Sequence, residues 1–253
     1  MTLAVVQSAS NNTEFSAATT LTCSLTSLPS VGNAVIAIFT TRGAAVVSSM
    51  ADNQSGNTYA KVVAAASSAG SAGDAEIWWL SSVVGASGTF TVTVTASASE
   101  PLTLTLIEVS GLNAIDQTGS ALYTGTNLAS ATVTGSAANT NATDLVVAAF
   151  GAGYQTGPTG TSNPCTTGYT SVAFLDGNSA PYGGVTQVSY KIVSAVETSS
   201  ATWTQTAGDF NTYAVALASF KSASTVTQTI KAMAVKSGYA PSSVASATYV
   251  ITV

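Results

Sequence analysis

The chain of 253 residues carries little charge. Only 7% of its residues are Asp, Glu, Lys or Arg, and it contains no histidine, whereas soluble domains average about 25% charged residues. Because most enzyme chemistry near neutral pH uses histidine, metal ligands or clustered charge, this composition favours a structural or binding protein over an enzyme. The net charge of −5, with only six Lys and Arg residues, also excludes a basic surface for nucleic acid.

Short segments in which apolar residues alternate with Thr or Ser predict β-strands along most of the chain. The clearest example has Phe90, Val92 and Val94 alternating with threonines. Such a strand has one buried face, as in a sandwich. The other predicted strands, in chain order, are Leu3–Ser8, Thr20–Leu25, Ala34–Thr40, Asn57–Val63, Glu76–Leu80, Leu102–Val109, Leu145–Phe150, Tyr169–Phe174, Val185–Val193 and Tyr213–Phe220.

Clusters of Gly, Asn, Asp and Ser separate these segments, for example at Asp52–Asn57 and Asp176–Ser179. These residues favour turns, because glycine reaches positive φ and Asn or Asp side chains bond the nearby backbone. No segment predicts a helix. The sequence therefore predicts an all-β fold, an antiparallel β-sandwich of the jelly-roll or Ig-like kind, over residues 1–221.

The composition changes near Phe220, and residues 222–226 predict a linker. Two strand-like segments follow, Thr227–Val235 and Ser246–Val253, which predict a C-terminal hairpin over residues 227–253. An isolated hairpin is marginally stable in water, so we expect it to pair with the main sandwich or with a neighbouring subunit. The apolar residues expected to mediate this assembly are Ile230, Met233, Val235, Tyr239, Tyr249 and Ile251.

The hairpin sequence is similar to that of a known module. Residues 229–239 read TIKAMAVKSGY and residues 243–249 read SVASATY. In this order they resemble the end of the chitobiase/hexosaminidase C-terminal-type domain, a small Ig-like module of secreted bacterial proteins. The resemblance covers residues 227–253 and implies an Ig-like strand pair in an extracellular setting.

A second resemblance covers residues 3–221. It rests on DNQSGNTY at residues 52–59, EIWW at 76–79, VSGL at 109–112 with Asp116 and Gln117, and DLVV at 144–147. These pieces resemble a β-sandwich module of large, repeat-bearing secreted bacterial proteins. The resemblance implies a surface location and no particular activity.

Two adjacent tryptophans, Trp78 and Trp79, lie on one predicted strand, so their side chains point to opposite faces. If Trp79 faces the core, Glu76 and Trp78 share the outer face. An exposed tryptophan beside a carboxylate suits a sugar ring, and Trp203 is a second candidate for such stacking. We favour the other interpretation, in which a loop or a second chain covers Trp78, because large exposed aromatic patches mark interfaces.

Glu76 and Glu108 lie in apolar predicted strands, where a carboxylate needs a partner. Two carboxylates about 5–10 Å apart would supply the acid and the nucleophile or base of a glycosidase. A sandwich glycoside hydrolase is therefore a second alternative function, although Glu108 lies at a strand end where a loop would solvate it.

Asp52 and Asp116 are weak candidates for calcium ligands, since calcium prefers oxygen donors. Their surroundings do not have the spacing of an EF-hand loop, and Asx-turns explain the same residues without metal. No other cofactor is expected. Zinc is excluded because there is no histidine and no pair of cysteines at CxxC spacing.

Cys23 and Cys165 are the only cysteines. They form one disulfide if the compartment is oxidising, or else they are two buried thiols that pack as small apolar groups. The sequence leaves both interpretations open.

The sequence contains no run of about 18 apolar residues that would span a membrane. Residues 1–10 lack the basic start and long apolar stretch of a signal peptide. We therefore expect either a mature secreted protein with a new Met1 or a protein made in the cytoplasm and released by lysis, as virion proteins are.

The leading functional prediction is a non-enzymatic structural subunit that assembles with copies of itself. It would form an extracellular filament, a surface layer or a virion decoration, through β-strand addition between subunits. The low charge supports this, because edge strands are normally protected by charged residues. The main alternative is a carbohydrate-binding or adhesive surface module.

Overall fold

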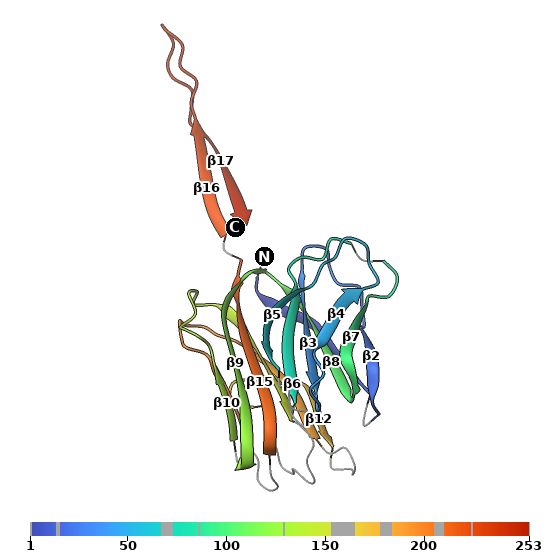
Figure 1. The fold of residues 1–253 in the computed structure, drawn as a ribbon. Coiled ribbons are helices and arrows are strands. Elements are labelled where there is room, and N and C mark those ends of the chain that lie inside the picture. Colours follow the sequence, from blue (N-terminus) through green and yellow to red (C-terminus); the bar gives the residue numbers. More distant parts are fainter. Residues whose placement is uncertain are drawn as a thin grey trace.

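The computed structural model describes residues 2–13, 16–66, 73–85, 87–128, 130–152, 165–177, 184–204, 210–223 and 225–252. These residues form seventeen β-strands and no helix, and the paired strands are antiparallel. The predicted all-β class and antiparallel sandwich are thereby confirmed. Figure 1 shows a body of packed sheets from which the last two strands project.

The first half of the body is a sandwich of a large and a small sheet, which we call the first sandwich (residues 2–110). The first large sheet has the order β1-β8-β3-β6-β5. Its strands are β1 (Ala4–Asn12), β8 (Leu102–Ser110), β3 (Ala34–Thr41), β6 (Asp74–Leu80) and β5 (Ala60–Ala65). The first small sheet, in the order β2-β7-β4, contains β2 (Ala18–Ser24), β7 (Thr91–Glu100) and β4 (Val47–Asp52).

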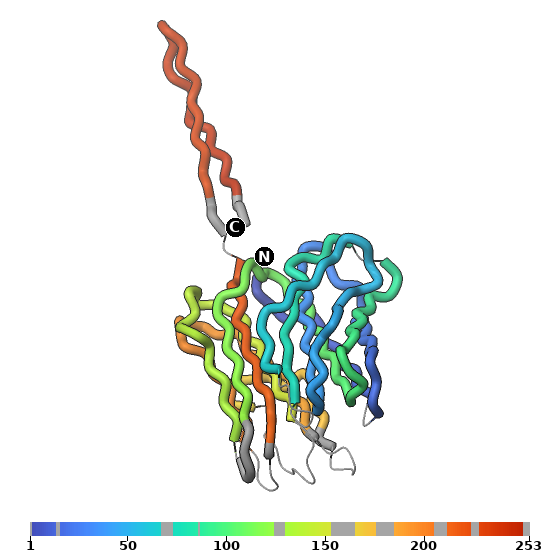
Figure 2. The backbone as a smooth tube through the Cα atoms, in the orientation of Figure 1, coloured from blue at the N-terminus to red at the C-terminus, as the bar shows by residue number. Residues whose placement is uncertain are grey.

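The second half repeats this plan, and we call it the second sandwich (residues 112–222). The second large sheet has the order β12-β13-β11-β15-β9. Its strands are β12 (Thr170–Gly177), β13 (Gly184–Ile192), β11 (Asp144–Ala152), β15 (Phe210–Ser222) and β9 (Leu112–Leu128). The second small sheet pairs β10 (Ser130–Thr134) with β14 (Ser200–Thr204). Figure 2 shows the two halves side by side.

The two sandwiches form a structural repeat, which we call the duplication. The strands of the first large sheet lie side by side in the order β1-β8-β3-β6-β5. Those of the second, read from its other edge, lie in the order β9-β15-β11-β13-β12, so each strand has the same place in its sheet as its counterpart in chain order. The central strands also match in sequence: Phe39 of β3 corresponds to Phe150 of β11, 111 positions later (150 − 39), and Val35 corresponds to Val146 at the same spacing. The single sandwich expected over residues 1–221 is therefore two sandwiches of the same topology.

Three cores separate four layers of sheet. Within β3, Val35 and Phe39 face the first small sheet and belong to the core of the first sandwich. Ile36 and Ile38 point the other way, into a core shared by the two large sheets. The side chains of β11 likewise alternate between the core of the second sandwich and the shared core. Both central strands are therefore buried on both faces, and this explains their nearly continuous apolar sequences.

The two large sheets approach closely where β6 begins and β11 ends. A methyl group added at Gly73 would overlap the carbonyl oxygen of Gly151, and one added at Gly151 would overlap the carbonyl oxygen of Asp74. Only glycine allows the two backbones this contact. The two sandwiches are therefore packed as one body and not joined by a loose linker.

The C-terminal hairpin consists of β16 (Thr225–Ala232) and β17 (Ala245–Thr252), which form a two-stranded sheet of their own. It points away from the body (Figure 1) and does not extend either sandwich. Because β15 continues to Ser222 and β16 begins at Thr225, strands occupy most of the predicted linker 222–226. Among the described residues, the hairpin shares no sheet with the main sandwich.

Candidate functional site

The projecting hairpin has two chemically different faces. Ile230 of β16 lies opposite Ala247 of β17. Ala247 precedes Tyr249 by two positions along β17. Because every second residue of a strand shares a face, Ile230, Ala247 and Tyr249 lie on one apolar face. The opposite face carries Thr229 and Thr248, whose hydroxyl oxygens are 3.3 Å apart.

The apolar side chains of the hairpin are exposed to solvent in the monomer. Ile230, Met233, Val235, Tyr239, Val244 and Tyr249 are each between 52% and 69% exposed. Five of them are residues predicted to mediate assembly; the side chain of the sixth, Ile251, lies outside what the structure describes. A two-stranded hairpin whose apolar face is uncovered gains little stability by itself, and exposed apolar patches are typical of interaction surfaces.

The root of the hairpin is fixed to the junction of the two sandwiches. The backbone N–H of Ala223 donates to the carbonyl oxygen of Gly111 at 2.7 Å, and that of Ser222 donates to Thr143 at 3.4 Å. Gly111 connects β8 to β9 with a φ of 71°, which glycine adopts without strain. The body therefore anchors the hairpin at its base and leaves its faces free.

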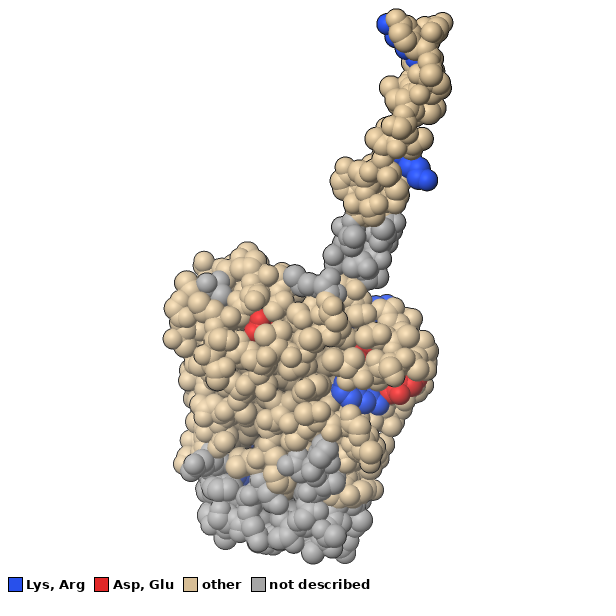
Figure 3. Space-filling model, turned by 180° about the vertical axis from the view of Figure 1, so that it is seen from behind, with Lys and Arg blue, Asp and Glu red and all other residues tan. Residues whose placement is uncertain are grey.

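Charge is distributed unequally between hairpin and body. Residues 225–252 contain Lys231 and Lys236 and no acid, so they carry +2, while the remaining four cations and eleven acids give −7. In Figure 3 the projecting segment shows only blue among its charged atoms, on an otherwise nearly uncharged surface. The formal charges of hairpin and body are therefore opposite in sign, although acids of the body such as Glu76 and Glu108 are buried.

The predicted binding residues Glu76 and Trp78 bind each other inside the first sandwich. The Glu76 carboxylate is fully buried; it accepts the Val47 backbone N–H at 2.7 Å and the Trp78 indole N–H at 2.9 Å. Lys61 forms an ion pair with it at 2.8 Å. Trp78 is partly buried against the first core, so neither its N–H nor the carboxylate is available for a sugar.

Beside this carboxylate lies an acid that the sequence did not single out. Asp74 is fully buried, and burial together with the charge of Glu76 raises its pKa to about 8. Asp74 is therefore protonated over most of the neutral range and relieves the repulsion between two buried carboxyl groups.

Trp203 is fully buried in the second sandwich, so the prediction that it stacks on a ligand was wrong. Its indole N–H donates to Oε1 of Gln187, and its ring packs against Phe150 with centroids 5.3 Å apart. Gln187 occupies in the second sandwich the place of Glu76 in the first, 111 positions later (187 − 76). Both tryptophans thus serve the two cores.

Glu108 is a buried structural acceptor, not a catalytic acid at a solvated strand end. Its carboxylate accepts hydrogen bonds from Gln7 Nε2 at 2.6 Å, the Ser30 backbone N–H at 2.9 Å and Asn33 Nδ2 at 2.6 Å. Three donors around one carboxylate stabilise its charge within the protein.

The two candidate catalytic acids lie at different heights of the first large sheet. Glu108 is opposite Val35 and Glu76 is opposite Phe39 on either side of β3. Four residues of strand separate these positions by about 13 Å along its axis. This separation exceeds that of a glycosidase pair, so Glu76 and Glu108 do not form the pair of acids that the hydrolase alternative needs.

Asp52 forms the Asx-turn that the sequence offered as the alternative to calcium. Its Oδ1 accepts the Gln54 backbone N–H at 2.9 Å and its Oδ2 accepts Asn57 Nδ2 at 3.0 Å. Within the described residues, no three His, Cys, Asp or Glu side chains are grouped as metal ligands.

Asp116, the other calcium candidate, lies in the second sandwich beside Asp144. It accepts Thr140 Oγ1 at 3.0 Å and lies 3.5 Å from Lys221 Nζ. Burial acts to raise the pKa of Asp116, but the hydrogen bonds from Thr140 and Asp144 and the charge of Lys221 together outweigh it and the pKa is lowered. Burial and the nearby Asp116 raise the pKa of Asp144 to about 7. The two carboxyl groups thus form a pair with one proton at mildly acidic pH.

Cys23 and Cys165 are both buried and unpaired. Cys23 belongs to the core of the first sandwich and Cys165 to that of the second, with two large sheets between them. The disulfide alternative is therefore wrong, and the thiols pack as apolar groups. Burial raises the pKa of the Cys23 thiol to about 11, so this thiol is unreactive.

Comparison with known proteins found no matching family model, curated protein or solved structure. The resemblances of residues 227–253 and 3–221 to bacterial modules therefore stay predictions. The part of the chain that the structure describes has no helix with the length and apolar character needed to cross a membrane.

Proposed function

We propose that this protein is a non-enzymatic structural subunit that assembles with copies of itself through its C-terminal hairpin. In this proposal the subunit belongs to an extracellular filament, a surface layer or a virion. The observation that carries it is the projecting hairpin, which exposes an apolar face including Ile230 and Tyr249 and shares no sheet with the rest of the described chain.

Strand addition explains how the hairpin joins a neighbour. In the described residues, β16 and β17 pair only with each other, so each keeps one edge of unpaired backbone N–H and C=O groups. Adding such an edge to a sheet of another subunit satisfies these groups and covers the apolar face. The positive hairpin and negative body favour contact between unlike parts of two copies.

The expected assembly is head-to-tail. A contact between the hairpin of one subunit and the body of the next uses two different surfaces, so it generates a ring if the rotation closes and a filament if it does not. This geometry agrees with a hairpin that projects from one end of the body (Figure 1).

Deletion of residues 225–252 tests the proposal. The truncated protein should keep its folded body and remain monomeric, because the three cores lie within residues 2–222. Size-exclusion chromatography, sedimentation and electron micrographs report the assembly, and circular dichroism reports the fold. Unchanged assembly after the deletion would refute the role of the hairpin.

A pair of substitution variants separates the two faces of the hairpin. Replacing Ile230 and Tyr249 by serine removes the apolar face and should abolish assembly. The control, Thr229→Ser with Thr248→Ser, alters the opposite face and should assemble as the parent does. Equal behaviour of the two variants would contradict docking through the apolar face.

A further inference from the structure

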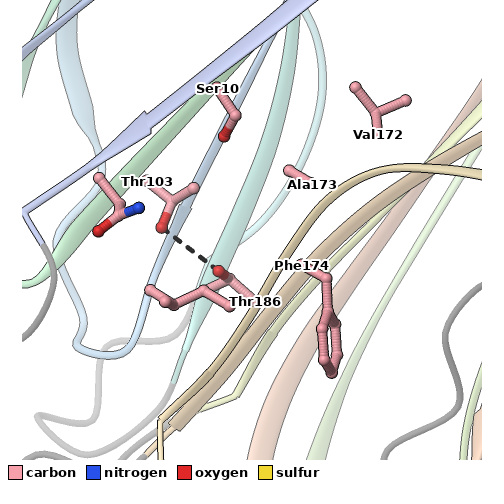
Figure 4. Close-up of a pocket in the computed structure, with 8 residues that line it drawn as sticks. Ser10, Thr103, Val172, Ala173, Phe174 and Thr186 are labelled. Atoms are coloured by element: carbon pink, nitrogen blue, oxygen red, sulfur yellow. Dashed lines mark hydrogen bonds between the residues drawn. The ribbon is translucent and has the colours of Figure 1, made fainter.

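A cavity of about 250 Å³ lies between the two large sheets where β1 and β12 approach each other. It is lined by Ser10 and Asn12 of β1, Thr103 of β8, residues 172–175 of β12 and Thr186 of β13. Figure 4 shows Ser10, Thr103 and Thr186 on one side of the view and Val172, Ala173 and Phe174 on the other. The cavity thus has a hydroxyl-bearing side and an apolar side.

The hydroxyl groups at the cavity have unused hydrogen-bonding capacity. Thr103 and Thr186 are nearly buried, and their hydroxyl oxygens are 3.3 Å apart (Figure 4). Ser10 pairs in the same way with Thr105 at 3.1 Å. A hydroxyl offers one donor and two acceptor sites, so each pair leaves one hydrogen and several lone pairs for another molecule.

The duplication shows that packing of the two large sheets does not require these hydroxyls. At the repeat spacing of 111, Thr103 corresponds to Ala214 (214 − 103) and Thr186 corresponds to Ala75 (186 − 75). Both alanines are fully buried in the core shared by the large sheets. The cavity beside β1 and β12 is therefore lined by the hydroxyl-bearing Thr103 and Thr186. The equivalent positions, Ala214 and Ala75, are apolar and packed in the shared core.

The lining defines the class of ligand. None of the described residues that line the cavity is charged, which favours a neutral molecule, since a buried charge without a partner is costly. Phe174, 37% exposed, adds an aromatic side chain to the lining. The volume lies just below the range of ~300–1,000 Å³ typical of drug-sized ligands, so the ligand is small.

We propose that this cavity binds a small, neutral, polyhydroxylated ligand with the chemistry of a single sugar ring. The threonine and serine hydroxyls bond the hydroxyl groups of the ring, and Phe174 packs against its C–H face. This site is separate from the hairpin and from Trp78 and Trp203. Ligand binding is therefore a property of the body.

Titration of the full chain with three probes tests the proposal. Glucose and myo-inositol are neutral rings with several hydroxyls, and glucuronic acid is a charged ring of similar size. Saturation-transfer NMR and calorimetry at millimolar concentrations should detect binding of at least one neutral ring and weaker binding of glucuronic acid. Chemical-shift changes should be confined to the residues of the cavity.

Variants assign the binding to the hydroxyl pair. The double change Thr103→Val and Thr186→Val keeps the shape but removes two hydroxyls, and should weaken binding about tenfold. The matched control is Thr132→Val with Thr202→Val, because these residues form a similar threonine pair, 2.9 Å apart, in the second small sheet. The control should bind within about twofold of the parent.

Phe174→Ser provides a second variant on the exposed rim, where folding is least at risk, and should also weaken binding. The proposal is overturned if neither neutral ring binds, if glucuronic acid binds equally well, or if the Thr103/Thr186 and Thr132/Thr202 variants have the same effect.

Discussion

The first and second sandwiches have the same topology but solve the problem of buried polar groups differently. At one position the first has Glu76, which binds Lys61 and two hydrogen-bond donors, whereas the second has Gln187, which accepts from the Trp203 indole. At another the first has Asn33, whose amide donates to Glu108, whereas the second has Asp144 beside a second carboxylate, Asp116.

This difference teaches that the duplicated fold depends on the apolar positions, not on the particular polar ones. The matching aromatic residues of the central strands occupy the same place in both cores. The polar positions vary as long as each buried group has a partner or becomes neutral. Exchanging polar residues between equivalent positions should therefore preserve the fold and change only its stability or pH dependence.

The largest effect is expected from the shared apolar positions. Phe39→Ala and Phe150→Ala each leave a cavity in one sandwich core and should each lower the free energy of unfolding by about 3–5 kcal/mol. Because a third core joins the sandwiches, each variant should still unfold in one transition. Calorimetry and urea denaturation followed by fluorescence measure both quantities.

Phe174→Ala, which truncates a partly exposed phenylalanine outside the three cores, is the control and should cost far less. Two separated unfolding transitions would show that the sandwiches do not unfold together. A large loss of unfolding free energy in only one of Phe39→Ala and Phe150→Ala would show that the two positions are not equivalent.

The next effect concerns the dependence of stability on pH. Burial and Asp116 raise the pKa of Asp144 from its ordinary value of 3.8 to about 7. Between these values the unfolded chain loses the proton first, so stability is highest in mild acid and falls as pH rises towards 7. We expect the Tm to drop by about 5 °C between pH 5 and pH 8.

Asp144→Asn installs the residue that the first sandwich has at this position, and its amide can donate to Asp116. It should raise the Tm at pH 8, change it little near pH 4, and so reduce the dependence of Tm on pH. Part of the slope should remain, because the pKa of Asp74 is also raised, to about 8. A wild-type slope in Asp144→Asn would contradict this origin.

The smallest effect tests the exchange of Glu76 for the glutamine of the second sandwich. Lys61→Met leaves the buried Glu76 carboxylate without its cation, and should cost about 1–2 kcal/mol at pH 7, since Lys61 itself is partly exposed. Adding Glu76→Gln removes the unpaired charge and should recover most of that loss. Chemical denaturation of the single and double variants measures this coupling; no recovery in the double variant would mean that Lys61 acts through packing alone.

Most strands were predictable from local sequence, and the exceptions have physical reasons. The alternation around Phe90, Val92 and Val94 predicted β7, and the continuous apolar segment at Leu145–Phe150 predicted β11. The strands β4, β9, β10 and β14 were missed. β10 and β14 are five residues long, which is too short for a periodic signal, and β9 is interrupted by glycines.

The duplication was visible in the sequence in principle, as a repeat spacing of 111 positions between segments such as Val35–Phe39 and Val146–Phe150. Few residues are identical at that spacing, so the shared strand order of the two sandwiches made it recognisable. Some features of the candidate site residues could be predicted from the sequence and others could not. The exposed hairpin residues could be predicted from composition, whereas the burial of Trp203 and the hydrogen-bond partners of Glu76 could not.

The sequence by itself determined that this chain forms antiparallel sheets and ends in an apolar hairpin, because side-chain alternation and turn residues act over a few neighbouring positions. Only the tertiary structure decided which face of each sheet is covered, which acids find partners, and that Thr103 meets Thr186 beside the cavity. These depend on contacts between different strands, such as that between Thr103 and Thr186, which lie 83 positions apart, and no local pattern encodes them.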